Sequence, residues 1–427
     1  MTPSSSIKNA GTLLSGNIIA QGIAFVSYLL LSRLFTPDDF GVYNIFYSYI
    51  EVLIILSTCK FEQAIVVAEG DAQAAGVARL ALRINTGVSL LLLVAAACLQ
   101  MPACGGSLPI PAPMVLLIPA MVFLCGTSRV YTFLGVRDRR YPTLAYGQVW
   151  NAAGTTVLRV AAGFVAPVVR WLQTFGLPLG TVLGRLAANL YLRKNTTRLL
   201  HDPTLKGGDR RALRHLGKRY RQYPLYVMPK EFVGSLSANL PFLWLSIHFD
   251  NAAIGLFAMS LTFLQRPVLM IANALEQSYF RDISERHQQR QALMPHLRPM
   301  LWGVGGVAVA VAAIGFFVAE PLFVFLLGDQ WVGTGFYVQC LLPWLVVRLL
   351  VNSLTFVGNV FETQHIDFLL QVLLLLLRVA ALYVGIRFDS FRMAVLLFCG
   401  VSAVVQTGQL IWYLWQIRRY DKSRADG

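Results

Sequence analysis

Long apolar stretches recur along the whole chain and constrain what it can fold into. Of the 427 residues, 56% are hydrophobic and only 13% are charged, against about 25% charged in an ordinary soluble domain. A membrane-spanning helix needs about 20 mostly apolar residues. Such stretches are predicted at 12–35, 42–60, 84–101, 114–135, 143–167, 171–191, 225–247, 252–275, 299–319, 333–358, 368–386 and 393–416. The sequence therefore predicts an all-α polytopic membrane protein with about twelve transmembrane helices.

The positive charges are concentrated in alternate loops. If the N-terminus is cytoplasmic, the inside loops hold most Lys and Arg residues outside the spans, including the dense run 193–221, whereas the outside loop 102–113 has none. Positive loops stay on the cytoplasmic side, so we expect both termini inside. The inside loop 359–367, which lacks Lys and Arg, is the exception. We therefore expect the net charge of +15 to orient the helices in the membrane and to contact anionic lipid headgroups, rather than to bind nucleic acid.

A long polar segment lies near the middle of the chain. It covers 193–223 and separates six predicted helices in 1–192 from six in 224–427. At an offset of 214 residues, 35–50 aligns with 249–264, with Phe, Gly and aromatic positions in common. The sequence therefore predicts two six-helix halves that arose by duplication and share one orientation, joined by a basic cytoplasmic linker.

Charged side chains occur within or at the ends of the predicted spans, where they are costly and usually face a cavity or a partner. They are Glu51, Arg129, Arg159, Arg185, Lys230, Glu231, Arg266, Arg348 and Arg378. Cations predominate, and guanidinium groups suit phosphate because they form paired, charge-assisted hydrogen bonds. This excess predicts an anionic substrate; an exporter of cationic drugs would be expected to have an acidic cavity.

Several of these residues have a second interpretation. Arg185 and Lys230 lie near the cytoplasmic ends of their helices, so their side chains can extend to the headgroups instead of binding substrate. Lys230 and Glu231 can also form a charge pair at a helix end. Glu51 can be the structural partner of an arginine or a protonatable group for ion coupling, and both interpretations stay open.

No catalytic motif occurs in the sequence. GxxxxGK[ST], HExxH and GxSxG are absent, the six histidines do not cluster, and the six cysteines have no metal-ligand spacing. We therefore expect no enzyme activity, metal site or cofactor. The energy for transport would then come from an ion gradient or from a partner.

Five segments together resemble a known family. They are 32–49 (SRLFTPDDFGVYNIFYSY), 59–85 (beginning CKFEQAIVV), 137–163 (beginning RDRRYPTLAYGQ), 220–280 and 322–344. They are similar to the Wzx-type polysaccharide and lipopolysaccharide (O-antigen) flippases of the multidrug/oligosaccharidyl-lipid/polysaccharide (MOP) exporter superfamily. The chain has Ala68-Glu69 where that family often has proline.

The resemblance implies a MATE/MOP-like fold, with two six-helix bundles around a central cationic cavity. It implies a flippase that moves undecaprenyl-diphosphate-linked oligosaccharide across the bacterial inner membrane for O-antigen, capsule or exopolysaccharide synthesis. The implied partners are this lipid-linked substrate and the bilayer, with a polysaccharide polymerase and a chain-length regulator, and no nucleic acid.

The candidate site residues follow from the interpretation of the chain as a flippase. The residues predicted to bind the substrate are Arg266, Arg348, Arg129, Arg378 and Lys230, and those predicted for ion coupling are Glu51 and Glu231. Two alternatives remain: a cation-coupled multidrug exporter of the same fold, and an enzyme such as a polysaccharide polymerase or a membrane acyltransferase. The short predicted outside loops disfavour the polymerase.

Overall fold

A computed structural model describes residues 3–101, 108–201 and 210–425. The predicted loop 102–113 and linker 193–223 therefore fall partly outside the described residues. Within these ranges the regular structure is helical and contains no strand. This confirms the predicted all-α class.

Twelve helices of 18 residues or more occur in the described ranges, and each overlaps one predicted span. They are α1 (Pro3–Leu34), α2 (Pro37–Ser57), α4 (Gly70–Leu99), α5 (Ala112–Arg137), α6 (Tyr141–Val165), α7 (Trp171–Thr196), α10 (Met228–Leu245), α11 (Asn251–Gln288), α12 (Met294–Leu327), α13 (Thr334–Ser353), α15 (Gln364–Arg387) and α16 (Phe391–Ala425). Shorter helices lie between them: α3 (Phe61–Val67), α8 (Arg198–His201), α9 (Arg210–Arg219), the π-helical turn Tyr223–Val227, the 3₁₀ turn Asp329–Trp331 and α14 (Phe356–Val360).

Nine helical segments of the described chain are long and apolar enough to cross a membrane. The long helices outside that set are α6, α7 and α10. Polar residues such as Arg159, Arg185 and Asn239 interrupt their apolar sequence. The chain is therefore a multi-pass membrane protein in which three long helices are unusually polar.

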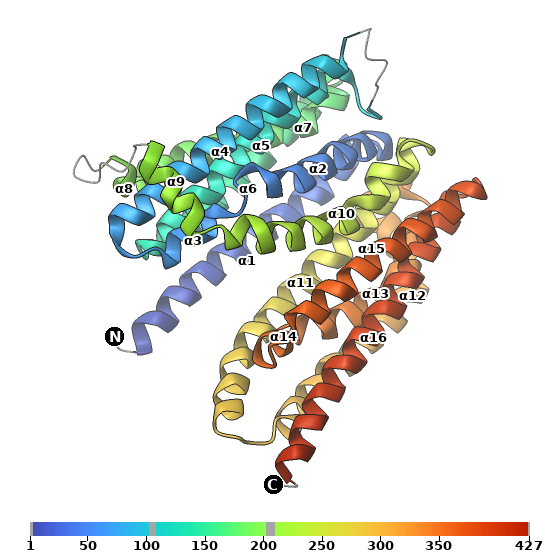
Figure 1. The fold of residues 1–427 in the computed structure, drawn as a ribbon. Helices are drawn as coiled ribbons and strands as arrows, with labels where there is room; N and C mark the ends of the chain where they lie inside the picture. Colours follow the sequence, from blue (N-terminus) through green and yellow to red (C-terminus); the bar gives the residue numbers. More distant parts are fainter. Residues whose placement is uncertain (1–2, 102–107, 202–209, 426–427) are drawn as a thin grey trace. The chain divides into compact units, whose positions relative to one another are not determined.

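The chain forms two compact units, Met1–Ile247 and His248–Gly427. In the N-terminal unit, α5 packs against α4 and α7, and α6 packs against α1 and α7 (Figure 1). In the C-terminal unit, α13 packs against α11, α12 and α16, and α15 packs against α16. Helix α10, which follows the basic segment in the sequence, packs against α2 within the N-terminal unit.

The helix pairs of the two units correspond to one another. The pairs α4–α5, α5–α7 and α6–α7 of the first unit have counterparts in α12–α13, α13–α16 and α15–α16 of the second. In addition, α2 begins at Pro37 and α11 begins at Asn251, 214 residues further along the chain. This is the offset of the sequence alignment, so the packing supports an internal repeat.

A capping box fixes the start of α2. The Thr36 backbone N–H donates to Asp39 Oδ2 at 2.9 Å, and the Asp39 N–H donates to Thr36 Oγ1 at 3.3 Å. Pro37 occupies the first helical turn, where its missing N–H costs nothing. Gln173 of α7 also donates to Asp39 Oδ2 at 2.9 Å, so the cap joins two helices as well as starting one.

Helices α6 and α7 approach closely at a pair of glycines. A Cβ on Gly184 would lie 2.6 Å from the backbone N of Thr155, whereas a Cβ on Gly154 would lie 3.8 Å from its nearest neighbour, the Cα of Gly184. Small residues allow such backbone contact between membrane helices, where packing rather than hydrophobicity drives association.

We predict that Gly184→Ala destabilises the protein by about 1–3 kcal/mol, because the new methyl group meets backbone atoms that cannot rotate away. Gly154→Ala is the matched control on the facing helix. It has room, and alanine is favoured over glycine in a helix by about 1 kcal/mol. Thermal unfolding of the purified protein in detergent measures both, and equal stability of the two variants would contradict the close approach.

Candidate functional site

The chain makes a sharp turn between α2 and α3. Helix α2 ends at Ser57, and Cys59 (φ 47°) and Lys60 (φ 63°) follow in the left-handed region before α3 begins at Phe61. Non-glycine residues rarely adopt this conformation, and it persists only where the surrounding structure holds it. The Phe61 N–H donates to the Thr58 carbonyl at 3.1 Å and closes the turn. The turn places Lys60 inside the N-terminal unit, where only 3% of its surface is exposed.

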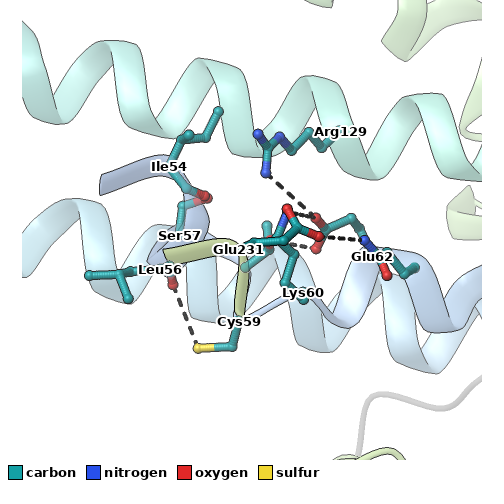
Figure 2. Close-up of polar contacts among 10 residues, drawn as sticks. Ile54, Leu56, Ser57, Cys59, Lys60, Glu62, Arg129 and Glu231 are labelled. Carbon is teal, nitrogen blue, oxygen red and sulfur yellow. Dashed lines mark hydrogen bonds and ion pairs between the residues drawn. The ribbon is translucent and has the colours of Figure 1, made fainter. Parts of the chain in front are cut away.

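Lys60 belongs to an ionic network that joins three helical segments (Figure 2). Its Nζ forms an ion pair with Glu231 in the first turn of α10 and lies 4.0 Å from Glu62 Oε1. Gln63 Nε2 donates to Glu231 Oε1 at 3.1 Å. We call Lys60, Glu62, Arg129 and Glu231 the Lys60 network.

Glu62 is the fixed member of this network. It is 1% exposed, and Thr58 Oγ1 donates to its Oε2 at 2.5 Å. Arg129 Nη1, from α5, lies 3.9 Å from Glu62 Oε1. That nitrogen is buried and has no hydrogen-bond partner among the described residues. The network thus contains two carboxylates and two cations, and Arg129 is the more loosely held cation.

Glu51 lies on α2 and contacts α10. Asn239 Nδ2 donates to its Oε2 at 3.1 Å, and Ser235 Oγ donates to its backbone carbonyl at 2.9 Å. These contacts join α2 to α10 through Glu51.

A second cluster lies in the C-terminal unit. The guanidinium carbon of Arg348 lies 5.1 Å from the ring centre of Trp344, and that of Arg378 lies 5.3 Å from the same ring and 4.4 Å from the ring centre of Phe398. We call Trp344, Arg348 and Arg378 the arginine–tryptophan cluster. Stacking on an aromatic face partly offsets the cost of removing a guanidinium from water.

Helix α16 holds two members of this cluster in place. Arg378 Nε donates to Ser402 Oγ at 2.9 Å, and Trp344 Nε1 donates to Gln406 Oε1 at 3.0 Å. Ser402 and Gln406 are four residues apart on the helix, so they lie on one face of it. The positions of the indole and of one guanidinium are therefore set by a single helix surface.

The arginine–tryptophan cluster is strongly positive. The guanidinium groups of Arg348 and Arg378 both lie near the Trp344 ring, and Arg378 is only 4% exposed. Arg348 forms no ion pair with a carboxylate in the described parts of the chain. Two like charges in a low-dielectric interior attract an anion that can bridge them. This arrangement can bind a group with two negative charges.

The remaining predicted residues are placed as follows. Arg266 lies on α11 beside Pro267 with an exposed side chain. Lys230 is partly exposed in the first turn of α10, and its side chain has no hydrogen bond or ion pair in the described ranges. The structure thus brings Arg348 and Arg378 together, and it places Arg129 with Glu231 in the Lys60 network.

Sequence reasoning missed Lys60, Glu62 and Trp344. Lys60 was the last residue of a predicted span, although a Lys-Phe-Glu sequence between two apolar stretches is a signal for a polar break between helices. Trp344 lies four residues before Arg348, a spacing that brings two side chains together on a helix.

Comparisons with known proteins agree with this fold. A family model described as polysaccharide biosynthesis protein matches residues 30–335. A search of curated proteins found no match. Among solved structures, an inward-facing multidrug resistance MATE family transporter of the MOP superfamily aligns with a TM-score of 0.69 at 12% identity, over 95% of this chain and 99% of that chain.

Two further structures share the architecture. The lipid II flippase MurJ, in an inward closed conformation, aligns with a TM-score of 0.68 at 10% identity, over 97% of this chain and 90% of that chain. A MOP superfamily transporter from Pyrococcus furiosus, described as having a binding pocket of reverse polarity, aligns with a TM-score of 0.60 at 12% identity, over 97% of this chain and 95% of that chain. The chain therefore has the MOP transporter fold, as the resemblance implied.

We predict that Lys60→Met lowers the free energy of unfolding by about 3 kcal/mol, because it leaves buried carboxylate charge without its cation. Adding Glu231→Gln in the same chain should recover part of that loss, since the charges then balance again. Chemical unfolding of the purified variants measures both effects.

The control is Arg219→Gln, which breaks the exposed ion pair of Arg219 with Glu69 (2.7 Å) and should cost less than about 1 kcal/mol. Equal losses in Lys60→Met and Arg219→Gln would show that the Lys60 network is not a buried unit.

Proposed function

The chain belongs to the family of polysaccharide biosynthesis proteins, and from this premise we propose that it is a flippase for lipid-linked oligosaccharides. It would carry undecaprenyl-diphosphate-linked units across the bacterial inner membrane, with both termini cytoplasmic, for O-antigen, capsule or exopolysaccharide synthesis. The MOP fold supports transport by alternating access, and one structural neighbour is itself a lipid II flippase.

The observation that carries this proposal is the arginine–tryptophan cluster. A diphosphate presents two adjacent groups of negative charge, and Arg348 and Arg378 present two adjacent guanidinium groups on one indole ring. Guanidinium binds phosphate oxygens through paired, charge-assisted hydrogen bonds. The cluster therefore matches the one chemical group that lipid-linked oligosaccharides of different sugar composition have in common.

The two arginines have different roles in this proposal. Ser402 holds Arg378 from α16, so Arg378 is already in position before an anion arrives. Arg348 is stacked on Trp344 and forms no ion pair within the described ranges, so its guanidinium is available to the incoming anion. Preorganisation of one partner lowers the ordering cost of binding.

The same cluster distinguishes the proposal from its main alternative. One structural neighbour is a multidrug resistance transporter, but a cationic drug would be repelled by two arginines that are stacked on the same ring. A polymerase or acyltransferase would need a catalytic constellation, and the arrangement of side chains described above supports binding rather than bond formation.

The other predicted residues complete the proposal. Arg266, Arg129 and Lys230 would add positive charge along the cargo's path, and Glu51 and Glu231 are the candidates for ion coupling. The basic segment 193–223 would join the halves 1–192 and 224–427 on the cytoplasmic side. A polymerase and a chain-length regulator would use the flipped units.

We predict that Arg348→Gln lowers the flipping rate at least tenfold, because one charge-assisted hydrogen bond to phosphate contributes about 1.5–3 kcal/mol. The measurement uses the purified protein in liposomes and a fluorescent polyprenyl-diphosphate oligosaccharide, with loss of signal after external quenching. Arg378→Gln should have a similar effect.

Arg392→Gln is the matched control. Arg392 also stacks on an aromatic ring of α13, with its guanidinium carbon 5.4 Å from the ring centre of Phe336, but its side chain is exposed. This variant should flip at the wild-type rate. Normal flipping by both Arg348→Gln and Arg378→Gln, or transport of a cationic dye in place of the diphosphate lipid, would overturn the proposal.

A further inference from the structure

The Lys60 network contains a carboxylate that lies where an external anion would bind. Figure 2 shows Lys60 and Arg129 on either side of the carboxylates of Glu62 and Glu231. We propose that Lys60 and Arg129 form a second anion-binding site, and that Glu231 occupies it until a phosphate group displaces it. That this phosphate belongs to the cargo rests on the flippase function proposed above.

Glu231 is the displaceable carboxylate. Its side chain is 39% exposed, whereas that of Glu62 is 1% exposed. Thr58 also fixes Glu62 through a hydrogen bond of 2.5 Å. Among the described residues, Glu231 is held by Lys60 and by the neutral amide of Gln63. Water and an incoming anion can therefore reach Glu231 but not Glu62.

Lys60 cannot follow Glu231 when that carboxylate leaves. The left-handed backbone at Cys59 and Lys60 and the burial of the side chain (4% exposed) hold its ammonium group inside the protein. Glu62 lies 4.0 Å away and offsets only part of its charge. Because an uncompensated buried charge is costly, departure of Glu231 leaves a site with net positive charge that favours another anion.

Arg129 has unused capacity for the same anion. Its Nη1 is buried, has no hydrogen-bond partner among the described residues, and makes only a long ion contact of 3.9 Å with Glu62. Leaving a buried donor without an acceptor costs free energy. A phosphate offers more acceptor oxygens than a carboxylate, so it can bind Lys60 and also satisfy Arg129.

The exchange has a structural consequence within the N-terminal unit. Glu231 lies in the first turn of α10, directly after the π-helical turn Tyr223–Val227. A π-turn is less regular than an α-helix and is often found at functional sites. Displacement of Glu231 would release the first turn of α10 from Lys60 and Gln63, so anion binding would be coupled to movement of that helix.

The test measures pyrophosphate binding to the full-length protein in detergent by calorimetry, in the Arg348→Gln background so that the arginine–tryptophan cluster contributes little. Glu231→Gln keeps the shape of the side chain and removes the competing charge. We expect it to tighten pyrophosphate binding about tenfold, and we expect Lys60→Met, added to it, to abolish that gain. The Lys60→Met/Glu231→Gln pair has balanced charges, so it should fold.

Glu69→Gln is the matched control, because Glu69, like Glu231, is paired with a cation, in this case Arg219, but its side chain is 72% exposed. It should leave pyrophosphate binding unchanged. Unchanged binding in Glu231→Gln, an equal gain in Glu69→Gln, or a gain that persists without Lys60 would overturn the second site.

The outcomes separate this inference from the proposed function. If flipping does not depend on Arg348 and Arg378, the flippase proposal is wrong. Tighter pyrophosphate binding by Glu231→Gln that requires Lys60 would still establish an anion site. Conversely, suppose that flipping depends on Arg348 as predicted while Glu231→Gln fails to tighten pyrophosphate binding. That result would support the flippase proposal and contradict the second anion site.

Discussion

A charged side chain inside a membrane protein is stable only where another group meets its charge, and both units are organised around this constraint. In the N-terminal unit, carboxylates from α3 and α10 meet Lys60 and Arg129. In the C-terminal unit, aromatic rings and a hydroxyl group meet Arg378. The first arrangement pairs two cations with two carboxylates, whereas the second places two guanidinium groups near one indole ring. That difference, rather than the number of arginines, separates the two clusters.

The two units share one polar contact between corresponding helices. Arg159 of α6 donates to Thr181 of α7 and stacks on Tyr43, as Arg378 of α15 donates to Ser402 of α16 and stacks on Phe398. Helices α6 and α7 correspond to α15 and α16 in the packing. Each half therefore joins these two helices through an arginine and a hydroxyl group, whereas the aromatic ring comes from α2 in the first half and from α16 in the second.

The helices could be predicted from the sequence because burial in lipid requires a continuous apolar run, and that signal is local. The Arg348–Trp344 contact could also be predicted from the sequence, since it follows from helical spacing. The Lys60–Glu231 pair was not, because it depends on a left-handed turn at two non-glycine residues and on packing between segments far apart in the sequence. Helix periodicity carries no information on either. The roles predicted for the seven candidate residues, from substrate binding to ion coupling, stay predictions.

The two proposed sites also differ in what an anion would gain by binding. At the arginine–tryptophan cluster, an anion would remove the repulsion between two guanidinium groups, so its binding would need no exchange of partners. At Lys60, an anion must first replace Glu231, so one ion pair is exchanged for another and the net gain is small. A transporter must release what it binds, and weak, exchangeable binding meets that need. Glu231 would therefore limit affinity at its site and return when the phosphate leaves, which resets the first turn of α10.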